Sequence, residues 1–77
     1  MSGATDRSEY LVVYEKTATG YSAYVPDLPG CTTTGPTFAA TKKNMQEAIR
    51  GHLAVMREFG DPIPQPTTVA ERMQIPA

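Results

Sequence analysis

The first candidates for chemistry in this sequence are its single cysteine, Cys31, and its single histidine, His52. A catalytic cysteine needs a base beside it and usually a third group that orients the base. Cys31 opens a short β-prone segment, whereas His52 falls between Ile49 and Leu53 on the apolar face of an expected helix. This placement favours a small buried cysteine and a hydrogen-bonded core or interface histidine over a catalytic pair. One cysteine also excludes an internal disulfide, and one cysteine with one histidine cannot complete a structural zinc site.

Phosphate contact is the second chemistry to consider, because Lys42, Lys43, Arg50 and Arg57 are clustered in sequence. Acidic residues are interspersed among them, and the whole chain has seven Lys and Arg against eight Asp and Glu, for a net charge of −1. A protein that binds nucleic acid through bulk charge is excluded at this balance. The sequence contains no glycine-rich phosphate loop, and its four tyrosines are not interleaved with basic residues as in a stacking platform.

The elements that must position any site begin with three short strands. Residues 10–16 are rich in aromatic and β-branched types and predict a strand, and residues 21–25 predict its return. A turn at residues 17–20 joins them, with Gly20 expected to adopt a positive φ. Two prolines interrupt the sheet at residues 26–30, and residues 31–34 predict a third short strand.

A helix is predicted over residues 38–59, with Thr37 as N-cap and Gly60 just past its end. One face carries mostly apolar residues at helical spacing, namely Phe38, Met45, Ala48, Ile49, His52, Leu53 and Met56. A proline-rich connector at residues 61–66 leads to a last strand at residues 67–75, where Val69, Met73 and Ile75 are apolar. The predicted fold is therefore α+β, a small two-layer βββαβ domain with one helix on a four-stranded sheet.

This element order also opens a ribonuclease-H-like fold, whose nucleases hold metal ions with acids on the first strand, the helix and the fourth strand. Glu15, Glu47 and Glu71 lie in the corresponding predicted elements. Glu47 falls on the charged outer face of the helix, however, and two-metal catalysis needs converging carboxylates. We therefore expect no nuclease site, no catalytic residue, no bound metal and no cofactor.

The first predicted strand is apolar on both faces. Tyr10, Val12 and Tyr14 point one way, and Leu11 and Val13 point the other. One amphipathic helix covers only one face of a sheet, so a second apolar surface is left over. We expect Tyr10, Val12 and Tyr14 to contact another copy in a homo-oligomer, a dimer or higher, because large apolar patches usually mark interaction sites. The alternative is that these are ordinary surface aromatics.

Size and composition bound the remaining possibilities. A chain of 77 residues buries only about 60% of its unfolded surface, so it forms one marginally stable domain. We place that domain at residues 9–77 and expect residues 1–8 to be a flexible N-terminus. The longest apolar run is five residues, far short of a membrane span, and the polar N-terminus has no secretion signal. The expected location is the cytoplasm.

The loop and its surroundings resemble a known protein family. Residues 26–31 read Pro26, Asp27, Leu28, Pro29, Gly30 and Cys31, and Gly35-Pro36-Thr37 follows at the predicted helix start. The helix contains Asn44, Glu47, Ala48, Ile49, His52 and Leu53, and Gly60-Asp61-Pro62-Ile63-Pro64-Gln65-Pro66 comes after it. These motifs are similar to those of the HicB family of antitoxins, over about residues 10–76.

The resemblance implies a partial ribonuclease-H-like domain without nuclease activity, which binds and neutralises a small mRNA-cleaving toxin of a type II toxin-antitoxin system. Direct binding to DNA is not expected, because the C-terminal DNA-binding domain of many family members has no counterpart here. The alternative is an orphan module, without enzymatic activity, that binds nucleic acid or a small molecule. A ribonuclease of the RNase H type is the least favoured reading.

An inhibitor of a ribonuclease needs carboxylates around an apolar centre, because the toxin's RNA-binding face must be basic. The candidate partner contacts are Tyr14, Tyr24, Leu28 and Asp27, with Glu15 and Glu71 as further carboxylates. The aromatic side chains among them are candidates for contact with the toxin or, equally, with a second copy of the chain.

Overall fold

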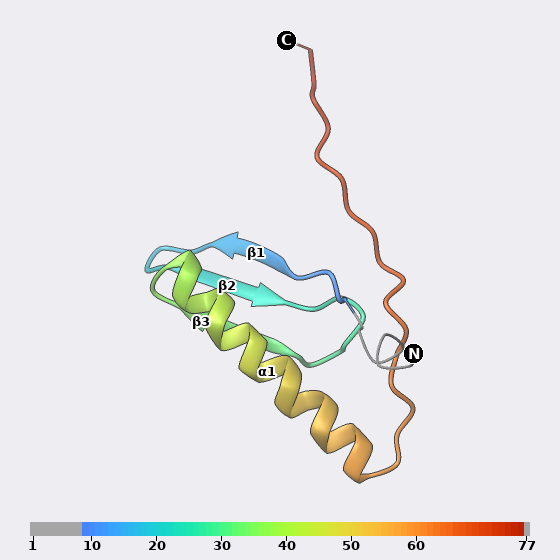
Figure 1. Ribbon diagram of the computed structural model, residues 1–77. Helices are drawn as coiled ribbons and strands as arrows, with labels where there is room; N and C mark the ends of the chain where they lie inside the picture. Colours follow the sequence, from blue (N-terminus) through green and yellow to red (C-terminus); the bar gives the residue numbers. More distant parts are fainter. Residues whose placement is uncertain (1–8, 77) are drawn as a thin grey trace, which may run out of the picture.

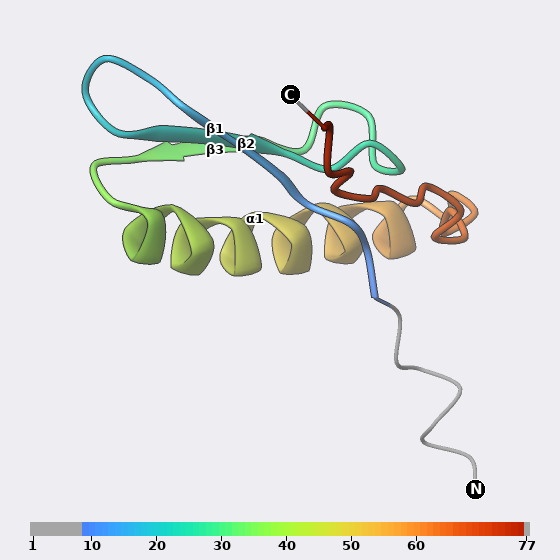
Figure 2. The same ribbon diagram turned by 90° about the horizontal axis from the view of Figure 1, so that it is seen from above.

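The computed structural model describes residues 9–76, so the expected flexible N-terminus at residues 1–8 lies outside the described part. Its elements are β1 (Val13–Lys16), β2 (Tyr21–Tyr24), β3 (Thr32–Gly35) and α1 (Phe38–Glu58). The strands form one antiparallel sheet in the order β1-β2-β3. Helix α1 lies against one face of this sheet, and within residues 9–76 no helix covers the other face (Figure 1, Figure 2). The predicted α+β class and two-layer arrangement are confirmed.

The β1–β2 hairpin forms where it was predicted, but the backbone conformation of Gly20 differs from the expected one. Thr17 donates its backbone N–H to the carbonyl of Gly20 at 2.8 Å, which closes the turn. The prediction of a positive φ at Gly20 is wrong, since the glycines with positive φ in the described chain are Gly30 and Gly60. A side chain at Gly20 would instead overlap the carbonyl oxygen of Gly35, so this glycine permits close approach to the end of β3.

Helix α1 begins at Phe38 as predicted and ends at Glu58, one residue before the predicted end. The Thr37 hydroxyl accepts a hydrogen bond from the Ala40 N–H at 3.0 Å, as an N-cap does. At the other end, Gly60 has a φ of 72°, and its N–H donates to the carbonyl of Arg57. The Gly60 conformation is the left-handed one that favours glycine after a helix.

The core lies between α1 and the sheet, and it is small. It consists of the buried side chains Ala23, Val25, Leu28, Cys31 and Met45, with partly buried apolar side chains around them. Thr41 is also fully buried, and its hydroxyl donates to the carbonyl of Thr37 at 2.7 Å. The helix backbone lies over β3 and β2, and β1 is reached by the Phe38 ring, which contacts Tyr14, so the edge strand is only partly covered (Figure 1).

The predicted fourth strand is not seen, so that part of the fold prediction is wrong for the isolated chain. Residues 61–76 contain neither helix nor strand and run as an extended segment. This segment passes the end of the sheet and continues beyond the β1 edge (Figure 1). Val69, Met73 and Ile75 have 91%, 73% and 78% of their surface exposed, because no sheet edge of the same chain pairs with them. We call residues 67–76 the C-terminal arm.

The two glycines Gly20 and Gly51 provide a matched test of this packing. Gly20→Ala should lower the free energy of unfolding by about 1–3 kcal/mol, because the added methyl group overlaps rigid backbone. Gly51→Ala should raise it by about 0.5–1 kcal/mol, because Gly51 is an exposed helical residue with open space at its Cβ position. Urea unfolding followed by circular dichroism measures both. Equal effects of the two substitutions would contradict the packing described.

Candidate partner-binding site

The motif loop of residues 25–31 folds around one buried side chain. Leu28 donates its N–H to the carbonyl of Val25 at 3.0 Å, and Cys31 donates to the carbonyl of Leu28 at 3.0 Å. Val25 in turn donates to the carbonyl of Cys31 at 3.2 Å, which closes the loop at its base. The Leu28 side chain is 0% exposed, so it fills the end of the core. Gly30 has a φ of 85°, which a β-branched residue resists.

Asp27, the second residue of the motif, anchors the C-terminal arm. One carboxylate oxygen accepts the backbone N–H groups of Thr67 at 3.0 Å and Thr68 at 2.9 Å. The other oxygen accepts the hydroxyl groups of the same two threonines, at 3.2 and 2.7 Å. These bonds lower the pKa of Asp27 from its ordinary value, with the two from Thr68 contributing most. A second anchor joins the Tyr10 hydroxyl to the carbonyl of Pro64 at 2.6 Å.

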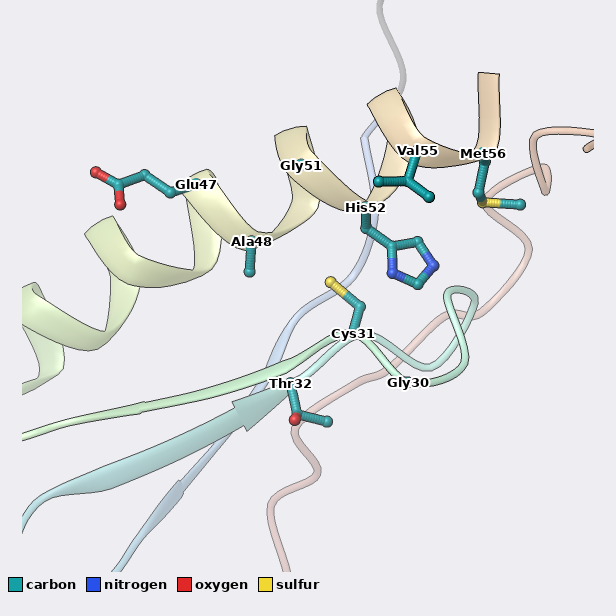
Figure 3. Close-up of a pocket in the computed structure, with 9 residues that line it drawn as sticks. All are labelled: Gly30, Cys31, Thr32, Glu47, Ala48, Gly51, His52, Val55 and Met56. Carbon is teal, nitrogen blue, oxygen red and sulfur yellow. The ribbon is translucent and has the colours of Figure 1, made fainter. Parts of the chain in front are cut away.

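Cys31 and His52 line one groove, of about 460 Å³, between the loop and the second half of α1. Cys31 points from the end of the sheet toward the helix, and His52 points from the helix toward the loop (Figure 3). Burial raises the pKa of the Cys31 thiol, whereas a nucleophilic cysteine needs a lowered pKa. The groove is lined mainly by apolar surface, with the half-exposed Val55 on one side. This chemistry fits packing rather than catalysis.

The face of the sheet opposite α1 presents the most accessible of the predicted contact residues. In the strand register Val13 lies opposite Tyr24 and Glu15 lies opposite Ser22. Tyr14 and Tyr21, which alternate with these residues, stack on Phe38 of α1 and so identify the helix side. Val13, Glu15 and Tyr24 therefore share the other side, which we call the open face. Tyr24 is 41% exposed there.

The structure separates the four residues predicted to contact a partner. Leu28 is fully buried and cannot belong to an accessible surface, which corrects its assignment. Asp27 is occupied by the arm, and Tyr14 lies on the helix side with its ring centroid 4.5 Å from that of Phe38. Tyr24, on the open face with Glu15 nearby in register, is the accessible aromatic of the set.

The three residues predicted to mediate self-association lie on a different surface from the one first supposed. Tyr10, Val12 and Tyr14 pack partly against the core, on the side where α1 lies. They are not the face opposite the helix, as the sequence argument assumed. Because α1 does not extend over β1, they remain only half-buried, and contact with a second copy stays a proposal.

The carboxylates of the nuclease hypothesis do not converge. Among residues 9–76, no group of three or more His, Cys, Asp or Glu side chains lies close enough to hold a metal ion. Glu71 lies in the arm rather than in a fourth strand. Within the same part of the chain, α1 lacks the continuous apolar stretch that a membrane-spanning helix requires.

The anchoring of the arm is the feature that sequence reasoning missed. Thr67 and Thr68 lie 40 and 41 residues from Asp27 in the chain, and no periodicity or motif links them. The only signal was chemical, because a loop carboxylate and two adjacent hydroxyl residues are suited to hydrogen bonding.

Asp27→Ala should release the arm while the rest of the domain stays folded. Backbone amides of Thr67 and Thr68 should then exchange with solvent much faster, because their acceptor is gone. Hydrogen exchange measured by NMR tests this, with Asp61→Ala as a control that removes the same charge from the connector. Unchanged exchange at Thr67 and Thr68 would contradict the anchor.

The anchor should also depend on pH with a definite sign. The folded-state pKa of Asp27 is lowered from 3.8, so the stabilising contribution is complete above that value. It is lost as the pH falls through the lowered pKa, when the carboxylate is protonated. NMR titration of the Asp27 side chain should give a midpoint below 3.8, and Asp27 in a peptide of residues 22–32 serves as reference. A midpoint at or above the peptide value would exclude the bonds described.

With the geometry established, comparisons with known proteins place the chain among relatives. An uncharacterized 14.9 kDa protein in the rep-hol intergenic region of Haemophilus phage HP1 is 33% identical over 67 residues, covering 87% of this chain and 50% of that protein. The chain thus spans half the length of that relative. The UPF0150 protein Ta0767 of Thermoplasma acidophilum is 36% identical over 58 residues, covering 74% of this chain and 84% of that protein.

A solved structure is similar in both fold and sequence. It is described as a HicA3 and HicB3 toxin-antitoxin complex, and one of its chains matches with a TM-score of 0.68 and 37% identity. The match covers 78% of this chain and 70% of that chain. Residues 10–77 also match the family described as the HicB-like antitoxin of bacterial toxin-antitoxin systems. The resemblance seen in the motif loop and helix is thereby confirmed, and the chain belongs to the HicB-like antitoxin family.

Proposed function

We propose that this protein is an antitoxin that binds a small toxin of the HicA type and neutralises it by protein–protein contact. The observation that carries the proposal is the similarity, at 37% identity, to a chain of a HicA3 and HicB3 toxin-antitoxin complex. Family membership over residues 10–77 supports the same conclusion. The chemistry of the described residues agrees with a binding role, because the buried thiol has a raised pKa and the carboxylates are dispersed.

The open face is the surface we assign to the toxin. It presents Tyr24 beside Val13, an exposed aromatic next to an aliphatic side chain, which is the composition of an interface centre. Glu15 adds a carboxylate at its border. If the toxin cleaves mRNA, its substrate-binding surface is basic, and a carboxylate at the rim accelerates the encounter. Blocking that surface would neutralise the toxin without any reaction.

Self-association is a second part of the proposal and involves another surface. Tyr10, Val12 and Tyr14 stay half-buried on the helix side of the sheet, so they can contact a second copy while the open face remains accessible. The two roles that competed for the same aromatics in the sequence are thus assigned to opposite sides of β1.

Tyr24→Ala should weaken binding to a HicA-type toxin from the same genome by about tenfold or more, the usual effect of removing a central interface tyrosine. Isothermal titration calorimetry measures the affinity. Phe59→Ala is the matched control, since Phe59 is 74% exposed but lies at the end of α1, away from the open face.

Two outcomes would count against these assignments. Unchanged affinity of the Tyr24 variant would exclude the open face as the inhibitory surface. No binding of any such toxin by the unaltered protein would refute the antitoxin proposal and favour the orphan binding module.

A further inference from the structure

The C-terminal arm is an extended segment that pairs with no strand of its own chain in the described residues. Val69, Met73 and Ile75 are almost fully exposed, although residues of these types prefer burial. All three fall on one side of an extended chain, because they are two or four residues apart. The arm also has unpaired main-chain groups over residues 69–76 in the described chain, so it is suited to join the edge of a sheet.

Strand β1 lies at an edge of the sheet, with no strand paired on its outer side in the described chain and apolar side chains that are only partly covered. The strand predicted over residues 10–16 forms a ladder only from Val13 to Lys16. On its helix side, Tyr10, Val12 and Tyr14 are half-buried, as are Ile49 and Leu53 of α1. An added strand with apolar side chains on that side would cover all of them. The β3 edge is less suitable, because α1 packs over it and Asn44 already donates to the carbonyl of Thr34 at 3.0 Å.

The arm does not fill this place in its own chain. Asp27 fixes Thr67 and Thr68 beside the motif loop, and from there the arm runs past the end of the sheet, transverse to β1 rather than along it (Figure 1). Ala70, Glu71 and Arg72 do lie close enough to Leu11, Val12 and Val13 to enclose a shared groove of about 350 Å³. Residues 70–72 of the arm thus lie next to the free edge, whereas the end of the arm projects away from the sheet, where a second molecule could meet it (Figure 1).

We infer that the arm of one copy pairs antiparallel with β1 of a second copy, and that the exchange is reciprocal. A two-fold dimer requires a donor and an acceptor on the same chain, and both are present here. Residues 71–75 of the arm are as long as residues 12–16 of the edge, so the two five-residue segments can face each other along their whole length. This inference rests on the self-association proposed above, and it shares Glu15 with the rim of the open face.

Charge complementarity selects one register. If Glu71 lies opposite Lys16 of the second copy, an antiparallel arrangement places Arg72 opposite Glu15. The same register sets Met73 against Tyr14 and Ile75 against Val12, on the helix side where apolar cover is missing. Opposite charges in directly facing positions stabilise strand pairs. A parallel arrangement cannot satisfy both charge pairs at once, because Glu15 and Lys16 would then face the wrong partners.

The first test measures mass by light scattering at about 50 µM, well above a micromolar dissociation constant. The unaltered 8.3 kDa chain should give twice that mass. The double variant Met73→Asp/Ile75→Asp should raise the dimer dissociation constant by more than about tenfold, because each carboxylate would enter an apolar surface. Ala70→Asp/Gln74→Asp is the control: it adds the same charge on the other side of the arm and should change the constant by less than about threefold.

The second test reverses a predicted charge pair. Arg72→Glu should weaken the dimer by about threefold or more, because it places two carboxylates opposite each other twice in the assembly. Adding Glu15→Arg should restore the lost affinity. Circular dichroism of every variant should show unchanged helix content, since α1 lies apart from the arm.

Each outcome of these tests decides a separate point. A monomer of the unaltered chain at 50 µM would overturn self-association and the arm exchange together. A dimer that tolerates Met73→Asp/Ile75→Asp would overturn the arm exchange while self-association stands. Failure of Glu15→Arg to rescue Arg72→Glu would overturn the register. Toxin affinity, measured separately, bears on none of these results.

Discussion

The burial of Leu28 is the constraint on which the rest of this small domain depends. The motif loop closes around that side chain with three main-chain hydrogen bonds, and the same loop turns Asp27 outward and Cys31 toward the helix. A domain of this size has few buried side chains, so a fully enclosed leucine makes a large contribution to its stability. The loop therefore joins the end of the sheet, the second half of α1 and the C-terminal arm in one structural unit.

The uneven coverage of the sheet follows from having one helix for three strands. Helix α1 packs over β2 and β3, which buries Ala23 and Met45 and leaves the aromatics of β1 half-covered. The half-covered side chains on the helix side of β1, and Tyr24 beside Val13 on the open face, are the apolar groups suited to contacts with other chains. The self-association and the toxin contact proposed above use opposite sides of this strand.

The inhibition proposed above, by contact with a toxin, needs no reactive group on this chain. The thiol of Cys31 is buried with a raised pKa, and Asp27, whose pKa is lowered, accepts the hydrogen bonds that fix the arm. Both pKa shifts thus have a structural cause, burial for Cys31 and hydrogen bonding for Asp27. Hydrogen bonds to the Asp27 carboxylate explain why a charged residue occurs in an otherwise apolar and proline-rich loop.

The sequence by itself determined the three strands, the capped helix, the α+β class and the family, because local periodicity, capping residues and the loop motif depend on neighbours in the chain. It also placed Tyr24 among four candidate contacts, and the structure shows that Tyr24 is exposed. Only the tertiary structure decided which side of β1 the helix covers, that Leu28 is buried, and that Gly20 is needed for close approach. The fourth strand predicted over residues 67–75 was wrong, since this segment is extended but pairs with no strand of the described chain. The Asp27 anchor joins residues 40 and 41 positions apart, and such a contact leaves no periodic signal in one sequence.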